Sequence, residues 1–316
     1  MVRENVVPLP AQRRILVIRN PTSGGGSALF SETINSLNEQ CDSLALRTTT
    51  ARGDGQTLAA GASRRDFDLV VAAGGDGTVA EVVSGLMAQA AESDPEQTPP
   101  AMAILPTGTA NVLANEVGLP FTAEELADLI AAGQPVSCSV GQIESYGYFG
   151  AMAGAGFDAH VVDQVDLGLK KRLGKAAYVW SALKALRETP NRYQVSIDGR
   201  TLSVGAVIVT LSRFYAGRFL IAPGAHLTRS EFKICLLAAD GLWDRLKFAV
   251  ALPLGLVPKL GSVRVLSGRE VLIKGTPGEP LQADGDIAAQ LPVRLIARPG
   301  AIKLIVPTKY RAGARA

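Results

Sequence analysis

Four short apolar runs in the first part of the chain are each followed by turn residues and then by a plausible helix start. The runs cover residues 15–18, 44–47, 69–72 and 102–105. Between about Arg13 and Ala132 they alternate with helical stretches, an order typical of parallel strands joined by helical crossovers. The pattern predicts an α/β domain with a parallel sheet and flanking helices over residues 1–133.

After Gly133 the chain changes to β-branched runs with hairpin signals. In the stretch RYQVSIDGRTLSVGAVIVTLS, Asp198-Gly199 is typical of a tight turn between antiparallel strands. Helices are expected at about 175–187 and 243–250, and strands resume at residue 263. We therefore predict a second, β-rich antiparallel domain over residues 134–316, and leave open whether its last strand returns to the first domain.

Composition and charge indicate which classes of protein this chain can belong to. The 316 residues are 47% hydrophobic and 19% charged, which indicates a folded globular protein. A net charge of +3 is too weak to indicate nucleic-acid binding, yet it is compatible with anionic phosphates or an anionic membrane surface.

Three widely spaced cysteines argue against a disulfide framework or a zinc cluster and favour a reducing cytoplasm. The longest apolar stretch, 248–257, is too short to span a bilayer.

Three loops at the carboxyl ends of predicted strands suit anion binding, because open α/β sheets bind ligands at that edge. They are RNPTSGGGS (19–27), AAGGDGTVAE (72–81) and LPTGTANVLANEVGLP (105–120). Their glycines let backbone N–H groups approach a polyphosphate, and each loop opens a helix. Each loop alone could be an ordinary glycine turn, but the three together favour a shared phosphate site.

Asp76 stands in the middle of the second loop. A phosphate group repels a carboxylate beside it unless a Mg²⁺ ion or a transferable proton lies between them. The position of Asp76 therefore favours phosphoryl transfer over simple anion binding.

The motifs NPTSGGG, GGDGT and PTGTANVLA, in this order, resemble the catalytic domain of the diacylglycerol kinase and sphingosine kinase superfamily, and most of all its compact bacterial lipid kinases. The likeness continues through GAGFDAHVV (154–162), FLIAPGAHL (219–227) and QADGDI (282–287). It implies an ATP-dependent lipid kinase with a nucleotide-binding lobe of NAD kinase/diacylglycerol kinase type and a lipid-substrate domain. ATP and Mg²⁺ are the cofactors that it implies.

The resemblance also assigns residues to the nucleotide. Thr49 fits a threonine shortly before a Gly-Asp pair, here Gly53-Asp54, and Glu81 fits an acidic residue one helical turn past the GGDGT loop. A solvated helix face is the alternative for Glu81. The nucleotide-binding set is Asn20, Ser23, Gly24, Gly25, Thr49, Gly74, Gly75, Gly77, Thr78, Glu81, Gly108, Thr109 and Asn111, with Asp76 among the catalytic residues.

Near the C-terminus the family carries an Asp-Gly-Glu motif that supplies the general base for the lipid hydroxyl, and here it reads Asp284-Gly285-Asp286. Asp286 occupies the position of the base and Asp284 supports it, although the shorter side chain leaves the role of each open. A tight hairpin turn is the structural alternative.

The sequence departs from the family at LTRSEFKICLL (227–237). Many bacterial relatives place an Asp-Gly pair there that helps to hold a structural Mg²⁺, and this chain has Arg229-Ser230. A guanidinium group repels a cation, so we predict no structural metal there: the site is absent or replaced by an internal ion pair. Mg²⁺ that arrives with ATP is a separate matter.

The resemblance implies a lipid acceptor such as diacylglycerol, a sphingoid base or phosphatidylglycerol, met during transient peripheral contact with a membrane. The segment 167–180 combines basic and aromatic residues and is either a membrane contact or a basic loop before a core helix. Trp243 and Phe248 could touch lipid or belong to the core. No nucleic-acid partner is expected, and a homodimer stays open.

Two other functions compete with a lipid kinase. An NAD kinase-like enzyme would share the GGDGT loop, although the PTGTAN segment argues against it. A catalytically decayed lipid-binding relative is the second alternative, and Arg229 is its only support.

Overall fold

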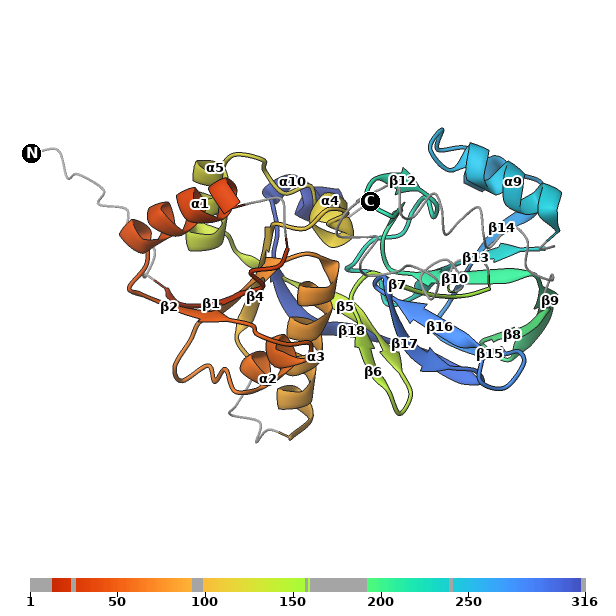
Figure 1. Cartoon of the computed structure of the whole chain (residues 1–316), viewed down its shortest axis with the longest axis horizontal. Coiled ribbons are helices and arrows are strands. Elements are labelled where there is room, and N and C mark those ends of the chain that lie inside the picture. Colours follow the sequence, from red (N-terminus) through yellow and green to blue (C-terminus); the bar gives the residue numbers. More distant parts are fainter. Residues whose placement is uncertain are drawn as a thin grey trace, which may run out of the picture.

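The structure is a computed structural model that describes residues 13–23, 27–92, 99–156, 159, 192–238 and 241–313. It has an α/β lobe formed by the first part of the chain and a β-rich lobe formed by the rest (Figure 1). The predicted fold class is thereby confirmed. The predicted helix at 175–187 and the segment 167–180 lie outside the described residues, as do Gly24 and Gly25.

The parallel sheet of the first lobe has the strand order β2-β1-β3-β4. Its strands are β1 (Arg14–Arg19), β2 (Ser43–Thr48), β3 (Leu69–Gly74) and β4 (Ala101–Pro106). Each contains one of the four predicted apolar runs, so all four predictions are confirmed. The central strand β3 is buried along its whole length, which explains why its sequence is a continuous apolar run.

Helices cover both faces of this sheet (Figure 1). They are α1 (Ser27–Gln40), α2 (Asp54–Ala60), α3 (Asp76–Glu92), α4 (Val112–Val117) and α5 (Ala123–Ala132). Helices α2 and α3 pack closely at Gly85, where a Cβ atom would lie 2.3 Å from the carbonyl oxygen of Gln56. The Thr122 side chain accepts a hydrogen bond from the Glu125 amide and so caps α5.

The second lobe is built largely from antiparallel strands. One of its sheets has the order β14-β13-β10-β7-β16-β17, and the predicted Asp198-Gly199 turn joins β8 to β9 in the other sheet. The strands are β5 (Pro135–Ile143), β6 (Gly147–Phe149), β7 (Met152–Ala155), β8 (Tyr193–Ile197), β9 (Arg200–Val204), β10 (Ala206–Thr210), β11 (Phe214–Tyr215), β12 (Phe219–Leu220), β13 (Phe232–Leu237), β14 (Val263–Gly268), β15 (Glu270–Lys274), β16 (Pro280–Ala283), β17 (Asp286–Gln290) and β18 (Val293–Ile305).

Between β13 and β14 lie α9 (Leu242–Ala251) and the short 3₁₀ helix η1 (Val257–Lys259), and α10 (Thr308–Gly313) follows β18. The helix predicted at 243–250 is confirmed as α9. Phe248 is buried as part of the core, whereas Trp243 is 72% exposed, so the core alternative is wrong for Trp243. In the part of the chain that the structure describes, no helix is long and apolar enough to cross a membrane.

Strand β18 connects the two lobes. Its 13 residues pair antiparallel with β15 and β5, and near its end Leu304 aligns with Met102 of the parallel strand β4. The large sheet therefore runs without a break from β2 to β9. The predicted domain boundary at 133–135 stays a prediction.

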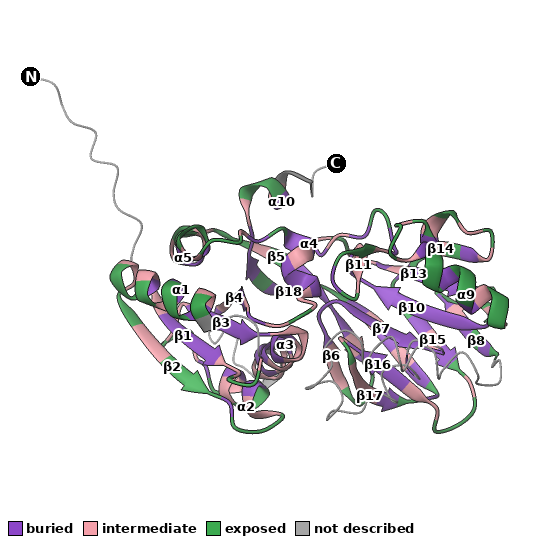
Figure 2. Cartoon of the chain, turned by 45° about the horizontal axis from the view of Figure 1, so that its top comes forward, coloured by how far each residue is buried: buried purple, intermediate pink, exposed green. Residues whose placement is uncertain are grey.

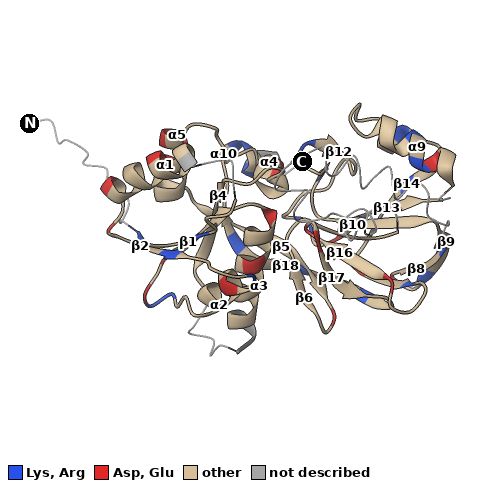
Figure 3. Ribbon diagram, in the orientation of Figure 1, with Lys and Arg blue, Asp and Glu red and all other residues tan. Residues whose placement is uncertain are grey.

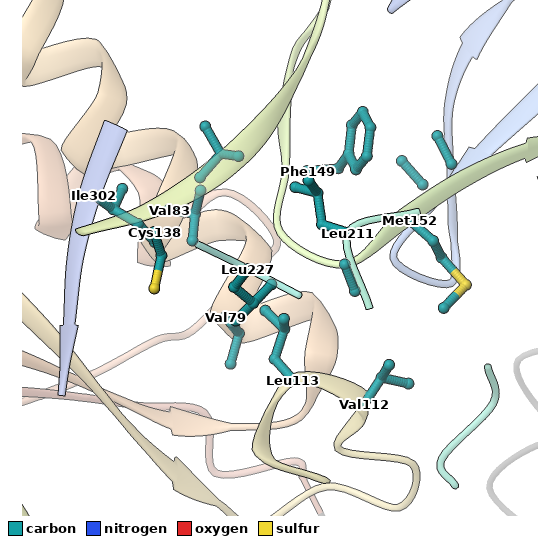
Figure 4. Packing of buried hydrophobic residues seen from close by; sticks show 14 of the residues in the cluster. Val79, Val83, Val112, Leu113, Cys138, Phe149, Met152, Leu211, Leu227 and Ile302 are labelled. Atoms are coloured by element: carbon teal, nitrogen blue, oxygen red, sulfur yellow. The ribbon is translucent and has the colours of Figure 1, made fainter. Parts of the chain in front are cut away.

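Buried residues continue from one lobe into the other (Figure 2). Val79 and Val83 of α3, Leu113 of α4, Cys138 of β5 and Ile302 of β18 lie together where elements of the two lobes meet (Figure 4). A cavity of about 10 Å³ lies among them, which is about the size of one water molecule and too small for an acyl chain. This packing fixes the position of the loops that extend from both lobes.

Candidate active site

The first and third predicted loops meet at the carboxyl edge of the parallel sheet. The Ser23 hydroxyl lies 2.7 Å from the Thr107 hydroxyl, and it donates a hydrogen bond to the carbonyl oxygen of Asn20. The Asn20 amide in turn donates to the carbonyl of Ala73, at the end of β3. These bonds draw the loop after β1 toward the loops after β3 and β4.

The second and third loops touch through two glycines. A Cβ atom on Gly108 would lie 2.4 Å from the Cα of Gly75, so only glycine at position 108 lets the two backbones approach this closely. The Thr107 amide also donates a hydrogen bond to the carbonyl oxygen of Gly74. The GGDGT loop and the PTGTAN loop therefore form one continuous backbone surface.

Asn111 shapes the third loop from within. Its side chain accepts a hydrogen bond from the Gly108 amide and donates one to the Gly108 carbonyl, while its own backbone is left-handed with φ 47°. Thr109 is exposed on the same loop, and Thr78 is buried on the first turn of α3. A Cβ atom on Gly74 would lie within 2.8 Å of three Thr78 side-chain atoms, so the turn needs glycine there.

Asp76 lies between the second and third loops. Its Oδ1 atom accepts a hydrogen bond of 2.6 Å from the Val112 amide, and the amides of Leu113 and Asn111 also favour its charged form. Burial nevertheless raises the pKa of Asp76, because desolvation outweighs these hydrogen bonds. Asp76 therefore links the start of α3 to the start of α4.

Asp284 is bound to the backbone of the second lobe. Its carboxylate accepts hydrogen bonds from the amides of Gly150, Ala151 and Met152 at 2.6, 2.9 and 2.9 Å. Burial raises the pKa of Asp284 to about 6, the three amides oppose this shift, and the charge of Asp76 adds to it. The two carboxylates therefore interact electrostatically across the lobe junction.

The Asp284-Gly285 pair is also a hairpin turn. Both residues have positive φ, at 49° and 89°, and they join β16 to β17 as a type I′ turn would. The structural alternative is thus correct for the backbone. It does not exclude a role for the side chains, because the same turn directs Asp286 toward the first lobe.

Asp286 lies directly against the GGDGT loop. A Cβ atom on Gly77 would be 3.5 Å from its Oδ2 atom, and the same Oδ2 atom is 3.6 Å from Nη2 of Arg52. The Asp286 side chain is half exposed, and among the described residues Arg52 is its one ion-pair partner. Of the two carboxylates in the Asp-Gly-Asp motif, Asp286 is the more accessible from the loops.

Glu81 and Thr49 support the loops from the side. The two carboxylate oxygens of Glu81 accept hydrogen bonds from the amides of Gly53 and Gly55 at 2.8 and 3.0 Å, so a solvated helix face does not describe this residue. Thr49 is buried, and its amide donates to the carbonyl of Arg19. Both residues hold the loop between β2 and α2, which carries Arg52.

Sequence reasoning did not identify Arg52. It follows β2, so it lies at the same sheet edge as the phosphate loops, and a basic residue at the carboxyl end of a parallel strand was the available signal. Arg52 is 72% exposed, and its guanidinium group lies 3.6 Å from Asp286 Oδ2, the atom that lies against Gly77 of the GGDGT loop. A guanidinium there suits a phosphate group.

A buried network around Glu116 was also missed. Glu116 of α4 is fully buried, with its carboxylate 3.2 Å from Nε of Arg213. The Ser212 hydroxyl and the Tyr310 hydroxyl both donate to it. The network joins α4 to the second lobe and to α10, so it holds the third loop in place from behind.

Arg229 lies on the surface, where its carbonyl oxygen accepts a hydrogen bond from the Ser139 hydroxyl. Among the described residues Arg229 forms no ion pair, so the predicted internal ion pair is not found in that part of the chain. Nor does that part contain a group of three or more His, Cys, Asp or Glu side chains arranged to hold a metal ion.

Two family models together cover most of the chain. Residues 14–143 match the diacylglycerol kinase catalytic domain, and residues 151–306 match the YegS C-terminal NAD kinase beta sandwich-like domain. The first match contains all three phosphate loops. The second contains Asp284 and Asp286.

Similar proteins carry related names. A "diacylglycerol kinase" of Bacillus subtilis (strain 168) is 27% identical over 307 residues, which cover 93% of this chain and 97% of that protein. A "probable lipid kinase YegS-like" protein of Chromohalobacter salexigens is 30% identical over 280 residues, or 87% of this chain and 88% of that protein. A crystal structure of a diacylglycerol kinase from Bacillus anthracis str. Sterne has a TM-score of 0.75 at 21% identity, over 95% and 99% of the two chains.

Proposed function

Because the chain belongs to the family of diacylglycerol kinases and YegS-like lipid kinases, we propose that it transfers the γ-phosphoryl group of ATP to a hydroxyl group of a lipid. The acceptor is a lipid such as diacylglycerol, a sphingoid base or phosphatidylglycerol. The observation that carries this proposal is the meeting of the loops at Gly75 and Gly108 opposite Asp286 of the other lobe. Such an arrangement can bind a polyphosphate and an acceptor hydroxyl on opposite sides of one gap.

In this proposal the nucleotide-binding surface consists of the backbone amides of the three loops, with the hydroxyls of Thr78 and Thr109. N–H groups at a helix N-terminus and in glycine turns stabilise phosphate charge without having to reorganise. The guanidinium group of Arg52 adds a positive charge beside the GGDGT loop. We include Arg52 in the nucleotide-binding set for this reason.

We assign the general base to Asp286. Its carboxylate is half exposed and faces Gly77, whereas three backbone amides already bind the carboxylate of Asp284. The acceptor hydroxyl gives its proton to Asp286, its oxygen forms a bond to the γ-phosphorus, and the bond from that phosphorus to the β-phosphate oxygen breaks as ADP leaves. Asp284 acts as a positioning residue, because it fixes the hairpin that presents Asp286.

The carboxylate of Asp76 suits Mg²⁺ that arrives with the nucleotide. Asp76 begins α3 within the GGDGT loop, and carboxylate oxygens are the ligands that Mg²⁺ prefers. When bound, the ion would neutralise phosphate charge next to Asp76. We propose no separate structural metal at Arg229.

Radiolabelled ATP offered with a lipid extract, and separately with NAD, tests the proposal after phase separation. Label in the organic phase is expected, and thin-layer chromatography of that phase identifies the acceptor. Asp286→Asn should abolish this label, while Asp66→Asn, at an exposed position away from the loops, should leave it unchanged. Label in the aqueous nucleotide would favour an NAD kinase-like enzyme instead.

A catalytically decayed lipid-binding protein remains the non-enzymatic alternative, with the surface residue Arg229 as its support. It predicts that the protein binds ATP, yet transfers phosphate to no acceptor in a mixed lipid extract. Turnover of ATP that depends on added lipid would exclude this alternative.

A further inference from the structure

Helix α9 presents an apolar face to solvent. Its inner face, with Phe248 and Ala251, packs on the second lobe. On the outer face Leu242, Leu246 and Val250 follow one another at i, i+4 and i+8, and all three are exposed. An ordinary surface helix is polar on its outer face, so this arrangement requires an explanation.

The exposed apolar residues are concentrated in this one place. Within the described ranges eleven large hydrophobic residues are exposed, and six of them lie between residues 242 and 256. The α9 patch, as we call it, consists of Leu242, Trp243, Leu246, Val250 and Leu254. Exposed apolar clusters of this kind mark surfaces that bind another protein or a membrane.

Basic side chains lie on α9 and on the two elements that follow it. Lys247 lies one helical turn after Trp243, Lys259 ends η1, and Arg264 lies on β14, against which η1 packs. All three are exposed, and the one acidic residue of α9 is Asp244 (Figure 3). This segment of the second lobe is therefore basic on its surface, and it would attract an anionic surface.

The α9 patch is structurally connected to the proposed catalytic site. Gly255 follows α9 and lies against Leu220 of β12, since a Cβ atom on Gly255 would be 4.0 Å from Leu220 Cβ. The β11–β12 hairpin then reaches the third phosphate loop, because the Asn115 side chain donates to the Gly217 carbonyl and accepts from Arg218. One short path of contacts thus runs from the patch to the loop that carries Asn111.

We infer that the α9 patch docks on the surface of a bilayer that contains anionic phospholipid. Trp243 suits this surface, because an indole ring combines an apolar body with an N–H donor and prefers the boundary between water and lipid. A second copy of the chain fits less well, since a twofold interface would bring the basic groups of the same elements toward each other. The inference rests on the proposed function, in which the acceptor lipid is drawn from a bilayer.

Vesicle binding without ATP tests the inference. The full chain should sediment with vesicles of phosphatidylcholine and phosphatidylglycerol, and more weakly with phosphatidylcholine alone. Trp243→Glu and Leu246→Glu should each weaken binding by about tenfold or more, because a large apolar side chain no longer leaves water. Tyr146→Glu is the matched control, since Tyr146 is 57% exposed in a turn far from α9 in sequence.

Tryptophan fluorescence provides a second readout. The sequence has two tryptophans, so a Trp180→Phe background leaves Trp243 as the reporter. Vesicles that contain brominated lipid should quench its fluorescence. If the chain binds these vesicles and the fluorescence of Trp243 is not quenched, the membrane contact lies elsewhere and the inference is wrong.

Further outcomes separate this inference from its alternatives. Trp243→Glu should keep the activity of the unaltered chain on a short-chain diacylglycerol dispersed below its micelle concentration. If Trp243→Glu binds vesicles like the unaltered chain but abolishes self-association in sedimentation velocity, the patch is an interface between copies and the inference is wrong. If the chain phosphorylates no lipid at all, the proposed function fails, whereas the vesicle-binding result is unaffected.

Discussion

The Oδ2 atom of Asp286 lies 3.6 Å from Nη2 of Arg52, so a carboxylate of β17 in the second lobe meets a guanidinium from the loop after β2 in the first lobe. Both side chains are at least half exposed, and an ion pair of this kind contributes little to stability. The position of this ion pair matters for the proposed catalysis, because the same Asp286 atom lies against Gly77 of the GGDGT loop.

Replacing Arg52 should weaken nucleotide binding. Arg52→Gln removes the guanidinium group that we assign to the nucleotide, and we expect the KM for ATP to rise by about tenfold, the usual effect of losing one charge-assisted hydrogen bond. Steady-state kinetics with varied ATP measures this. Arg200→Gln, at an exposed position on β9, is the control and should leave the KM unchanged.

The two aspartates of the Asp-Gly-Asp motif should respond differently to the same substitution. Asp286→Asn should reduce kcat by at least about 100-fold, because the general base is lost, with little change in the melting temperature. Asp284→Asn should instead destabilise the fold by about 1–3 kcal/mol, because an amide group faces three backbone donors. Equal losses of stability in the two variants would contradict these separate roles.

The ionisation of Asp284 should be visible in the pH dependence of stability. Burial raises its pKa to about 6, above the value of about 3.9 in an unfolded chain. The folded protein then binds more protons between these values, so the contribution of Asp284 is fully present below about pH 4 and is lost as the pH rises through about 6. Relative to Asp284→Asn, the free energy of unfolding should therefore fall across this window, as urea unfolding at several pH values can measure.

Asp54 provides a control of opposite sign. Hydrogen bonds from the amides of Thr50 and Ala51 and from the Thr50 hydroxyl lower the pKa of Asp54. Its contribution should therefore be present above its unfolded pKa and decrease as the pH falls. If the comparisons of the unaltered chain with Asp284→Asn and with Asp54→Asn gave pH slopes of the same sign, the assignment for Asp284 would be wrong.

The contact between the second and third loops should not tolerate a side chain at position 108. In Gly108→Ala the new Cβ atom would lie 2.4 Å from the Cα of Gly75, and backbone cannot move aside as a flexible side chain can. We expect a loss of about 1–3 kcal/mol in stability, together with weaker ATP binding in calorimetry. Gly261→Ala is the matched control, because open space surrounds that position.

The buried Glu116 network should be important for stability. Glu116→Ala removes the partner of Arg213 and of two hydroxyl donors, and we expect the free energy of unfolding to fall by about 3 kcal/mol. This value is at the lower end for a broken buried ion pair, because Arg213 is partly exposed. Chemical denaturation measures this loss. Glu124→Ala, at an exposed position on α5, should change the free energy of unfolding by less than about 0.5 kcal/mol.

The first lobe could be predicted in detail because its signals are local. The apolar run of β3, the glycines that end it and the helix start at Asp76 are adjacent in the sequence, so neighbouring residues suffice to identify strand, turn and helix. The phosphate loops follow from the same pattern, since the carboxyl ends of parallel strands share one edge.

Other features depend on partners that are distant in sequence. The amides that bind Asp284 lie more than 130 residues earlier, and Arg213 follows Glu116 by 97 residues. The residues next to Glu116 in the sequence therefore predict a solvated position on a short helix, although Glu116 is fully buried in the structure. The opposite holds for Trp243. An apolar residue on an amphipathic helix is predicted to lie in the core, and only the orientation of α9 in the structure shows that Trp243 is exposed.

The order in which a ribosome makes this chain conflicts with the order of strands in the large sheet. Strand β18, which pairs with β4 of the first lobe, is synthesised long after β4. Until it emerges, the nascent first lobe exposes the backbone of β4 as an open edge, which other chains can pair with. A truncated product that ends near residue 133 would keep this edge permanently, so it should aggregate where the 316-residue chain folds.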